Sequence, residues 1–175
     1  MDNNDILIRL RYALDIKDID MVEIFKCGGI EVTKEEVLKM LIKSKDSYHN
    51  ESGNDGYEDK NKENLECNNF MLESFLNCFI IFKRGRQEPK PGQPERPALS
   101  IKDNGSVNNV MLKKLKIALA LTSEDMLDIL ETAGITITKG ELSAIFRREG
   151  HKNYKACGDK YARNFLKGLA IRYRE

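Results

Sequence analysis

The chain of 175 residues contains no tryptophan, only four prolines and only two histidines. It also has no run of 18 apolar residues, which excludes a transmembrane helix and predicts no membrane partner. Lys and Arg number 29 against 28 Asp and Glu, so no field of one sign over the whole molecule draws it to a polyanion. The first residues, Met1-Asp2-Asn3-Asn4-Asp5, are acidic and polar. We expect no secretory signal and a cytoplasmic protein.

Sequence signatures of catalysis and of cofactor binding are missing as well. The chain has no phosphate-binding G-x-x-x-x-G-K-[ST], no G-x-G-x-x-G, no G-x-S-x-G and no H-E-x-x-H. No two Cys or His residues have the short spacing of a structural zinc site, and the cysteines form no C-x-x-C pair: they are Cys27, Cys67, Cys78 and Cys157. We expect reduced thiols, no metal, no cofactor and no catalytic residue, and so no enzyme.

The strongest positive signal is an internal repeat. A shift of 105 positions sets residues 3–41 against residues 108–146 without a gap, and 14 of the 39 pairs are identical. Average composition would give about two or three identities in that length. After a length change the match resumes with a shift of 90, so that Cys67 aligns with Cys157 and Phe75 with Phe165. The chain is therefore predicted to be a tandem duplication.

The repeat divides the chain into predicted units. Residues 1–84 form the first helical repeat, and within it residues 44–66 are a polar insertion without an apolar period. Residues 85–107 contain all four prolines and are predicted to be the linker, and residues 108–175 form the second repeat.

The apolar period inside each repeat is that of helices. Thr33-x-x-Glu36 and Thr138-x-x-Glu141 are capping boxes that predict a helix start at the same place in both copies. Ser123 is predicted to cap the helix before the second box, and Gly29 and Gly134 to end the helices before the two boxes. Without strand alternation, the predicted fold class is all-α, with about four helices in each repeat.

The last helix of the first copy, predicted at residues 68–83, is apolar on nearly every side. Such a helix is buried all round, so we expect it to pack against the other repeat or against a second chain. It is thus the predicted surface for a protein partner or for self-association.

Before the last helix of the second copy lies a polar loop, Gly150-His151-Lys152-Asn153-Tyr154-Lys155-Ala156-Cys157-Gly158-Asp159. Together with Arg163–Leu169, and with Asn3-Asn4-Asp5-Ile6-Leu7 and its copy at Asn108, this loop resembles the signature of the YehS-like bacterial family, a domain of unknown function numbered 1456. The resemblance covers nearly the whole chain, except at residues 44–66, where the family is usually shorter. It implies a cytosolic bacterial protein of helical repeats and supplies no activity, cofactor or catalytic residue.

The signature loop of unknown role comprises His151, Lys152, Tyr154, Cys157 and Asp159. In a catalytic interpretation His151 is a base, or Cys157 is a nucleophile whose pKa a neighbouring cation lowers. In the structural interpretation Asp159 caps the following helix, and Tyr154 and Cys157 lie beneath it. We favour the structural interpretation, because a packing cysteine recurs in both copies while the histidine does not.

Charge is unevenly divided along the chain. Residues 106–175 carry 13 Lys or Arg and 8 Asp or Glu, a net charge of +5, whereas residues 1–105 carry 16 and 20, a net charge of −4. Four cations of the last helix lie within about 60° of one another at 100° per residue, and we call them the basic face: Lys160, Arg163, Lys167 and Arg174. They are candidate contacts to nucleic acid, although a solvated helix also carries such a face.

Duplication without a catalytic signature favours a cytosolic, non-enzymatic helical-repeat protein that acts as a protein-interaction or regulatory module. The alternative is a nucleic-acid-binding protein that uses the basic face of the second repeat. An enzyme with a site between the repeats is the third interpretation.

Overall fold

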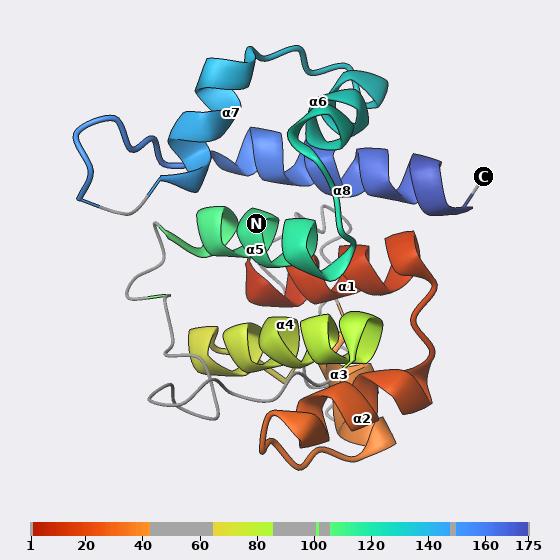
Figure 1. Ribbon diagram of the computed structural model, residues 1–175. Coiled ribbons are helices and arrows are strands. Elements are labelled where there is room, and N and C mark those ends of the chain that lie inside the picture. Colours follow the sequence, from red (N-terminus) through yellow and green to blue (C-terminus); the bar gives the residue numbers. More distant parts are fainter. Residues whose placement is uncertain (1, 43–64, 86–100, 102–105, 148–149, 175) are drawn as a thin grey trace, which may run out of the picture.

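The computed structural model describes residues 2–42, 65–85, 101, 106–147 and 150–174. Within these ranges the chain forms eight helices and no strand, which confirms the all-α fold class (Figure 1). The first repeat contributes α1 (Asn3–Leu14), α2 (Asp18–Cys27), α3 (Lys34–Met40) and α4 (Asn69–Arg84). The second repeat contributes α5 (Val107–Ala118), α6 (Ser123–Thr132), α7 (Lys139–Phe146) and α8 (Asp159–Arg174). The predicted insertion and linker lie almost entirely outside the described residues.

Local capping chemistry sets the helix starts in both copies. The Thr33 and Thr138 side chains accept hydrogen bonds from the backbone N–H groups of Glu36 and Glu141, so both predicted capping boxes are confirmed. The predicted cap at Ser123 is wrong by one residue. Thr122 is the N-cap of α6, because its hydroxyl accepts from Asp125 N while its own N–H donates to the Asp125 carboxylate.

The glycines predicted to end α2 and α6 have the backbone that this role requires. Gly29 and Gly134 have φ angles of 81° and 92°. Residues with a side chain rarely adopt this left-handed conformation, which turns the chain out of the helix.

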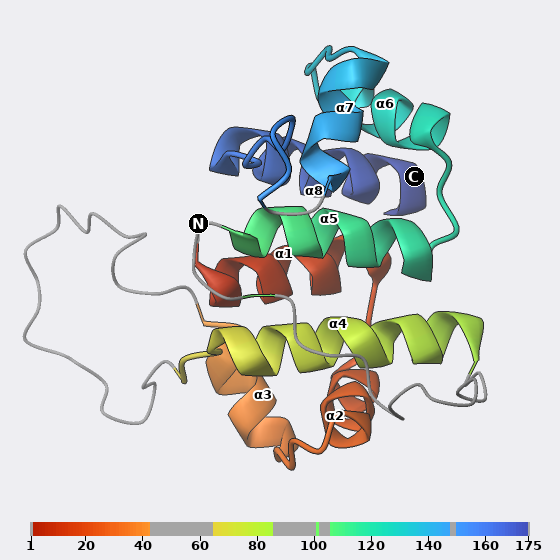
Figure 2. The ribbon, with the colours of Figure 1, turned by 60° about the vertical axis from the view of Figure 1, so that its left-hand side comes forward.

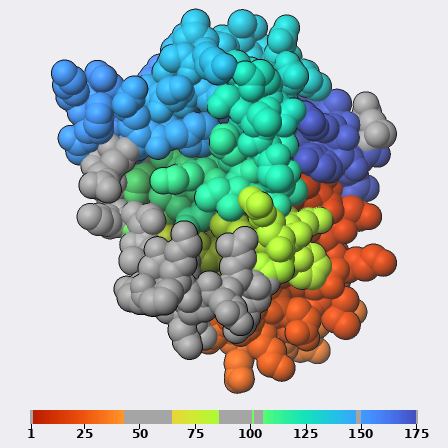
Figure 3. All heavy atoms as spheres, viewed as in Figure 1, coloured from red at the N-terminus to blue at the C-terminus, as the bar shows by residue number. Residues whose placement is uncertain are grey.

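The eight helices are stacked in layers. Both views show α1 and α5 between α8 on one side and α4 on the other, with α6 and α7 outside α8, and α2 and α3 outside α4 (Figures 1 and 2). The four helices of the middle layers, α1, α4, α5 and α8, run in the same direction (Figures 1 and 2). In Figure 3 the helices of the second repeat, green to blue, lie on those of the first, red to yellow-green. One continuous apolar core contains residues of both repeats, from Ile6 in α1 to Leu169 in α8.

The first helix of each repeat packs against the last helix of the other repeat. The helix α1 packs along α8, and at the equivalent place α5 packs along α4. A matched pair of hydrogen bonds closes the two contacts: Arg84 donates to Ile117 O at 3.2 Å and Arg174 donates to Tyr12 O at 2.8 Å. Donors and acceptors in this pair are equivalent under the shifts of 90 and 105. The two copies are therefore related by an approximate twofold rotation, as in an isologous dimer.

The apolar helix α4 obtains most of its burial within the chain. It packs against α2 of its own repeat and α5 of the other, and the ring of Phe75 lies 4.9 Å from that of Phe25 between centroids. This is the first of the two expected arrangements, packing against the other repeat. Only its ends expose large apolar side chains, Phe70 at 54 % and Phe82 at 49 %.

Candidate functional site

A buried asparagine fixes the end of the signature loop. Asn109, on the first turn of α5, donates from Nδ2 to Ile145 O at 3.0 Å and to Lys155 O at 2.9 Å. Its Oδ1 accepts from the backbone N–H of Cys157 at 2.8 Å. One amide therefore satisfies three backbone groups on α7 and on the loop, which holds the loop against the start of α5.

The same network recurs in the first repeat. Asn4 donates to Met40 O at 2.9 Å and to Leu65 O at 2.7 Å, and it accepts from Cys67 N at 2.9 Å. Sequence reasoning missed this role of the asparagines. One signal in the sequence could have shown this role: Asn4 and Asn109 are identical and polar, although the helical period places both positions on the core side of their helices.

The two repeated cysteines are structural. The sulfurs of Cys67 and Cys157 donate to the carbonyl oxygen of the following residue, at 3.7 and 3.6 Å. Burial raises the pKa of each thiol from 9.0 to about 12, and the carboxylates of Asp2 and Asp159 add to the effect at Cys67 and Cys157, respectively. A thiol with such a pKa is almost fully protonated at neutral pH, so Cys157 is not an activated nucleophile.

Thiol alkylation checks this conclusion. At pH 8 a pKa of about 12 leaves about one thiol in 10⁴ ionised, so native Cys67 and Cys157 are expected to react with iodoacetamide far more slowly than the half-buried Cys27. Because the unfolded thiols ionise near pH 9, the stability that these groups contribute is present below pH 9 and is lost as the pH rises towards 12. Peptide mapping after timed labelling measures the three rates. Equal rates at all three cysteines would contradict the structure.

The remaining residues of the signature loop form local contacts. His151 is exposed, its Nδ1 accepts from Asn153 N at 3.0 Å, and its carbonyl accepts from Tyr154 N at 2.9 Å. Among the described residues no hydrogen bond joins His151 to Cys157. At the end of the loop the Asp159 carboxylate accepts from Asn108 Nδ2 at 2.8 Å, which holds the pKa of Asp159 below its usual value. This contact ties the first turns of α5 and α8 together.

The basic face separates into two parts. Lys160, Arg163 and Lys167 are exposed, and no ion pair involves them within the described part of the chain. Arg174 instead lies against α1, where its guanidinium carbon is 4.3 Å from the centroid of the Tyr12 ring and its Nη1 is 3.6 Å from Asp15 Oδ1. Arg174 is thus held by contacts inside the molecule, as the equivalent Arg84 is.

Further exposed cations lie on the segment that leads into α8. Arg147, Lys152 and Lys155 are exposed, and the Lys155 ammonium is 5.8 Å from the centroid of the Tyr161 ring. Together with Lys160, Arg163 and Lys167 they extend the positive surface from the end of α7 along α8.

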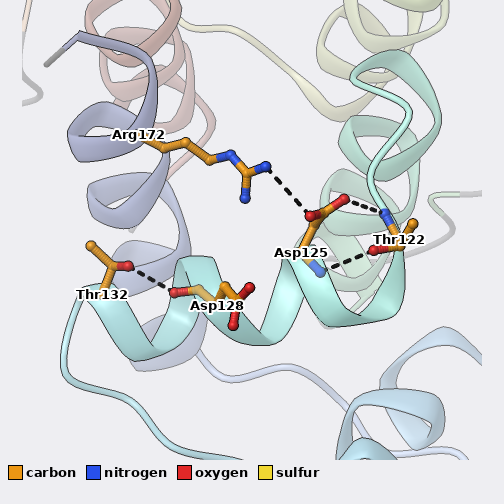
Figure 4. Close-up of polar contacts among 5 residues, drawn as sticks. All are labelled: Thr122, Asp125, Asp128, Thr132 and Arg172. Atoms are coloured by element: carbon orange, nitrogen blue, oxygen red, sulfur yellow. Dashed lines mark hydrogen bonds and ion pairs between the residues drawn. The ribbon is translucent and has the colours of Figure 1, made fainter.

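Four of the eight Asp and Glu residues of the second repeat lie on α6. Asp125 accepts from Thr122 and lies 3.4 Å from Arg172, and the Thr132 hydroxyl bonds to the carbonyl of Asp128 one turn earlier (Figure 4). Glu124 pairs with Lys139 at 2.8 Å. A shallow hollow beside them is lined by acidic and apolar side chains, among them Glu124, Asp128 and Glu131. Lys139 and Arg172 are therefore paired with carboxylates of α6, whereas no such pair involves the exposed cations at the start of α8 among the described residues.

Neither a metal centre nor a membrane span occurs among the described residues. There, no three His, Cys, Asp or Glu side chains come together as a metal site would require. No helix in that part of the chain has the length and apolar character needed to cross a membrane.

The fold and its contacts define a class: an all-α protein built from two copies of a four-helix unit that share one core. The chain belongs to the family described as protein of unknown function DUF1456, which matches residues 3–85 and 108–175. It is 36 % identical over 173 residues to the uncharacterized protein YehS of Escherichia coli (strain K12), an alignment that covers 98 % of this chain and 96 % of that protein. No solved structure matches.

Proposed function

We propose that this chain is a non-enzymatic, cytosolic binding protein whose ligand is nucleic acid, held on the exposed part of the basic face: Lys160, Arg163 and Lys167. The observation that carries the proposal is the position of these cations. They are exposed along α8, and within the described residues none of them forms an ion pair. Unpaired lysines and arginines of this kind neutralise phosphates and release counterions on binding.

The spacing of the three cations suits a phosphate backbone. At 1.5 Å per residue, Lys160 and Lys167 are about 10 Å apart along the axis of α8, which is about three nucleotides of one strand at 3.4 Å each. The exposed Arg147, Lys152 and Lys155 continue the positive surface before the helix starts. Contacts to phosphate carry no sequence information, so binding with little sequence preference is expected.

Charge reversal tests the proposal. The double variant Lys160→Glu/Lys167→Glu is expected to weaken binding of a labelled oligonucleotide and to reduce the slope of log K against log [salt], by about 0.7 to 0.9 for each phosphate that the variant no longer neutralises. Fluorescence anisotropy at several salt concentrations measures both quantities. The matched control, Lys17→Glu/Lys34→Glu, changes the charge equally at exposed positions of the first repeat and should leave affinity and slope unchanged.

The proposal is rejected if the native protein gives a flat titration at low salt, or if both double variants lower affinity equally. Circular dichroism melts of the variants establish that each has folded.

A second candidate is a protein-interaction or regulatory module that binds its partner, or a second copy, through α4. The observation in its favour is the exposure of Phe70 and Phe82 at the two ends of that helix. A stable complex would be expected to lose affinity in Phe70→Ser or Phe82→Ser while Ile19→Ser, at another exposed apolar position, leaves it unchanged. Light scattering coupled to size exclusion shows whether a dimer forms, and a monomer at all concentrations removes self-association from consideration.

A further inference from the structure

The approximate twofold rotation creates two equivalent surface seams with opposite chemistry. One seam runs between α4 and α5, and the other runs between α8 and α1. The shifts of 90 and 105 that align the repeats make Glu73 equivalent to Arg163 and Lys114 equivalent to Arg9. The charged residues at equivalent positions of the two seams can therefore be compared directly.

At the α4–α5 seam the buried carboxylate has a hydrogen-bond donor from the chain itself. Glu73 is 1 % exposed, and its carboxylate accepts from the backbone N–H of Ile101 at 2.7 Å. Lys114 lies on the facing helix α5, where burial lowers its pKa and the Glu73 carboxylate acts in the opposite direction. The two sides of this seam thus carry opposite charges, and Ile101, which donates to Glu73, packs on the core.

The α1–α8 seam has the same framework, but it carries an arginine at both of these equivalent positions. Arg9 and Arg163, which replace Lys114 and Glu73, are both exposed, and no ion pair involves them within the described residues. Asp5 accepts from Asp2 N in the capping box of α1. Asp159 accepts from Asn108, and the charge of Arg163 also contributes to lowering the pKa of Asp159. Two exposed arginines can both donate to the oxygens of a bound anion, whereas the lysine and the buried glutamate of the other seam cannot.

An aromatic ring stands at the far end of the same seam. Tyr12 of α1 is 60 % exposed although the Arg174 guanidinium lies over its ring at 4.3 Å from the centroid. The guanidinium also donates to the Tyr12 carbonyl, so the backbone and the cation fix the ring in place. A held, solvent-exposed ring next to a line of cations is the combination that proteins use to bind single strands.

We infer that the α1–α8 seam holds a single strand of nucleic acid, with Arg9 and Arg163 on either side of its phosphodiester backbone and a base stacked on Tyr12. The inference rests on the proposed function and adds the strandedness of the ligand and two contacts from the first repeat. The site is therefore composite, and neither repeat supplies it alone.

Chemistry favours a single strand over the other polyanions. The bases of a single strand are unpaired and can stack on Tyr12, whereas the bases of a duplex are already paired and stacked. An acidic polypeptide would use the arginines but would gain little from an exposed tyrosine, because its carboxylates carry no ring to stack.

The test compares labelled oligothymidine of 20 nucleotides with a 20-base-pair duplex of mixed sequence, using the full chain. The native protein is expected to bind the single strand about tenfold more tightly than the duplex. Arg9→Glu should weaken single-strand binding and reduce the salt slope by about 0.7, because one phosphate is no longer neutralised. Tyr12→Ala should weaken it by about fivefold or more and leave the slope unchanged, because stacking releases no counterions.

Matched controls exist at equivalent or exposed positions. Ile117→Ala alters the residue equivalent to Tyr12 on the other seam, and Lys17→Glu reverses an exposed charge off the seam. Both should leave affinity unchanged, and thermal melts confirm folding of every variant.

The outcomes separate this inference from the proposed function. If the duplex binds as tightly as the single strand, or if Arg9→Glu and Tyr12→Ala have no effect while Lys160→Glu/Lys167→Glu abolishes binding, the inference is overturned and the proposed function stands. Displacement of the single strand by polyglutamate at equal charge concentration would overturn the inference in favour of an acidic polypeptide. If the protein binds neither the single strand nor the duplex, both the inference and the proposed function are rejected.

Discussion

Replacing Gly168 by alanine is expected to lower the free energy of unfolding by about 3 kcal/mol and the melting temperature by about 6–12 °C. Gly168 lies in α8 where that helix crosses α6. A Cβ atom there would overlap the carbonyl oxygen of Ile129 and lie 2.8 Å from its Cγ2, so a rigid backbone would have to move. Alanine favours the helix by about 1 kcal/mol over glycine, and the overlap must exceed that gain. Thermal unfolding followed by circular dichroism measures the difference.

A second glycine provides the control. Gly140 lies in the first turn of α7, and a Cβ atom there would meet only the Thr138 hydroxyl, at 3.8 Å. Gly140→Ala is therefore expected to leave stability unchanged or to raise it by up to about 1 kcal/mol. Equal melting of the native protein and Gly168→Ala would show that α6 and α8 are not as close as the structure has them.

The sequence predicts those features that depend on a few neighbouring residues. The boxes at Thr33 and Thr138 and the turns at Gly29 and Gly134 are local, and both appear in the structure. The duplication predicts that each copy folds in the same way, which the matched contacts of Asn4 and Asn109 confirm. The error at Ser123 is also local, since Thr122 and Asp125 form a capping box that competes for the same helix start.

The pairing of helices between repeats depends on contacts that no local pattern contains. Periodicity places Arg174 on the basic face with Lys160, but its partner Tyr12 is 162 positions away. Likewise the apolar surface of helix 68–83 requires a neighbour without specifying that α5 supplies it. Arg9 escapes sequence reasoning for the same reason: its relation to Arg163 follows only from the twofold relation of the folded repeats.

Replacing Asn109 by aspartate is the second change for which a large loss of stability is expected. Asn109→Asp keeps the shape of the side chain and the oxygen that accepts from Cys157, but it replaces the NH₂ group that donates to Ile145 and Lys155. A carboxylate oxygen would then face the buried carbonyl oxygen of Ile145 and the partly buried one of Lys155 with no hydrogen between them. Because each buried acceptor left without a donor costs about 1–3 kcal/mol, the decrease in stability at pH 7 is expected to be about 3 kcal/mol.

The decrease should depend on pH in a defined direction. Repulsion from the carbonyls and burial both favour the protonated acid, so the pKa of the new carboxyl in the folded protein lies above its unfolded value. The variant is therefore most nearly native in acid, where a carboxylic O–H can donate to one of the carbonyls, and it loses stability as the pH rises through the folded pKa. Urea unfolding at pH 5 and pH 7 measures the difference against native protein at the same pH.

Two further variants serve as controls. Asn153→Asp, in the exposed part of the loop, should show no such difference, whereas Asn4→Asp should reproduce it because the first repeat contains the same network. If Asn4→Asp and Asn109→Asp differed by more than the usual few tenths of a kcal/mol in their pH dependence, the two copies would not share this mechanism of holding the segment before their last helix.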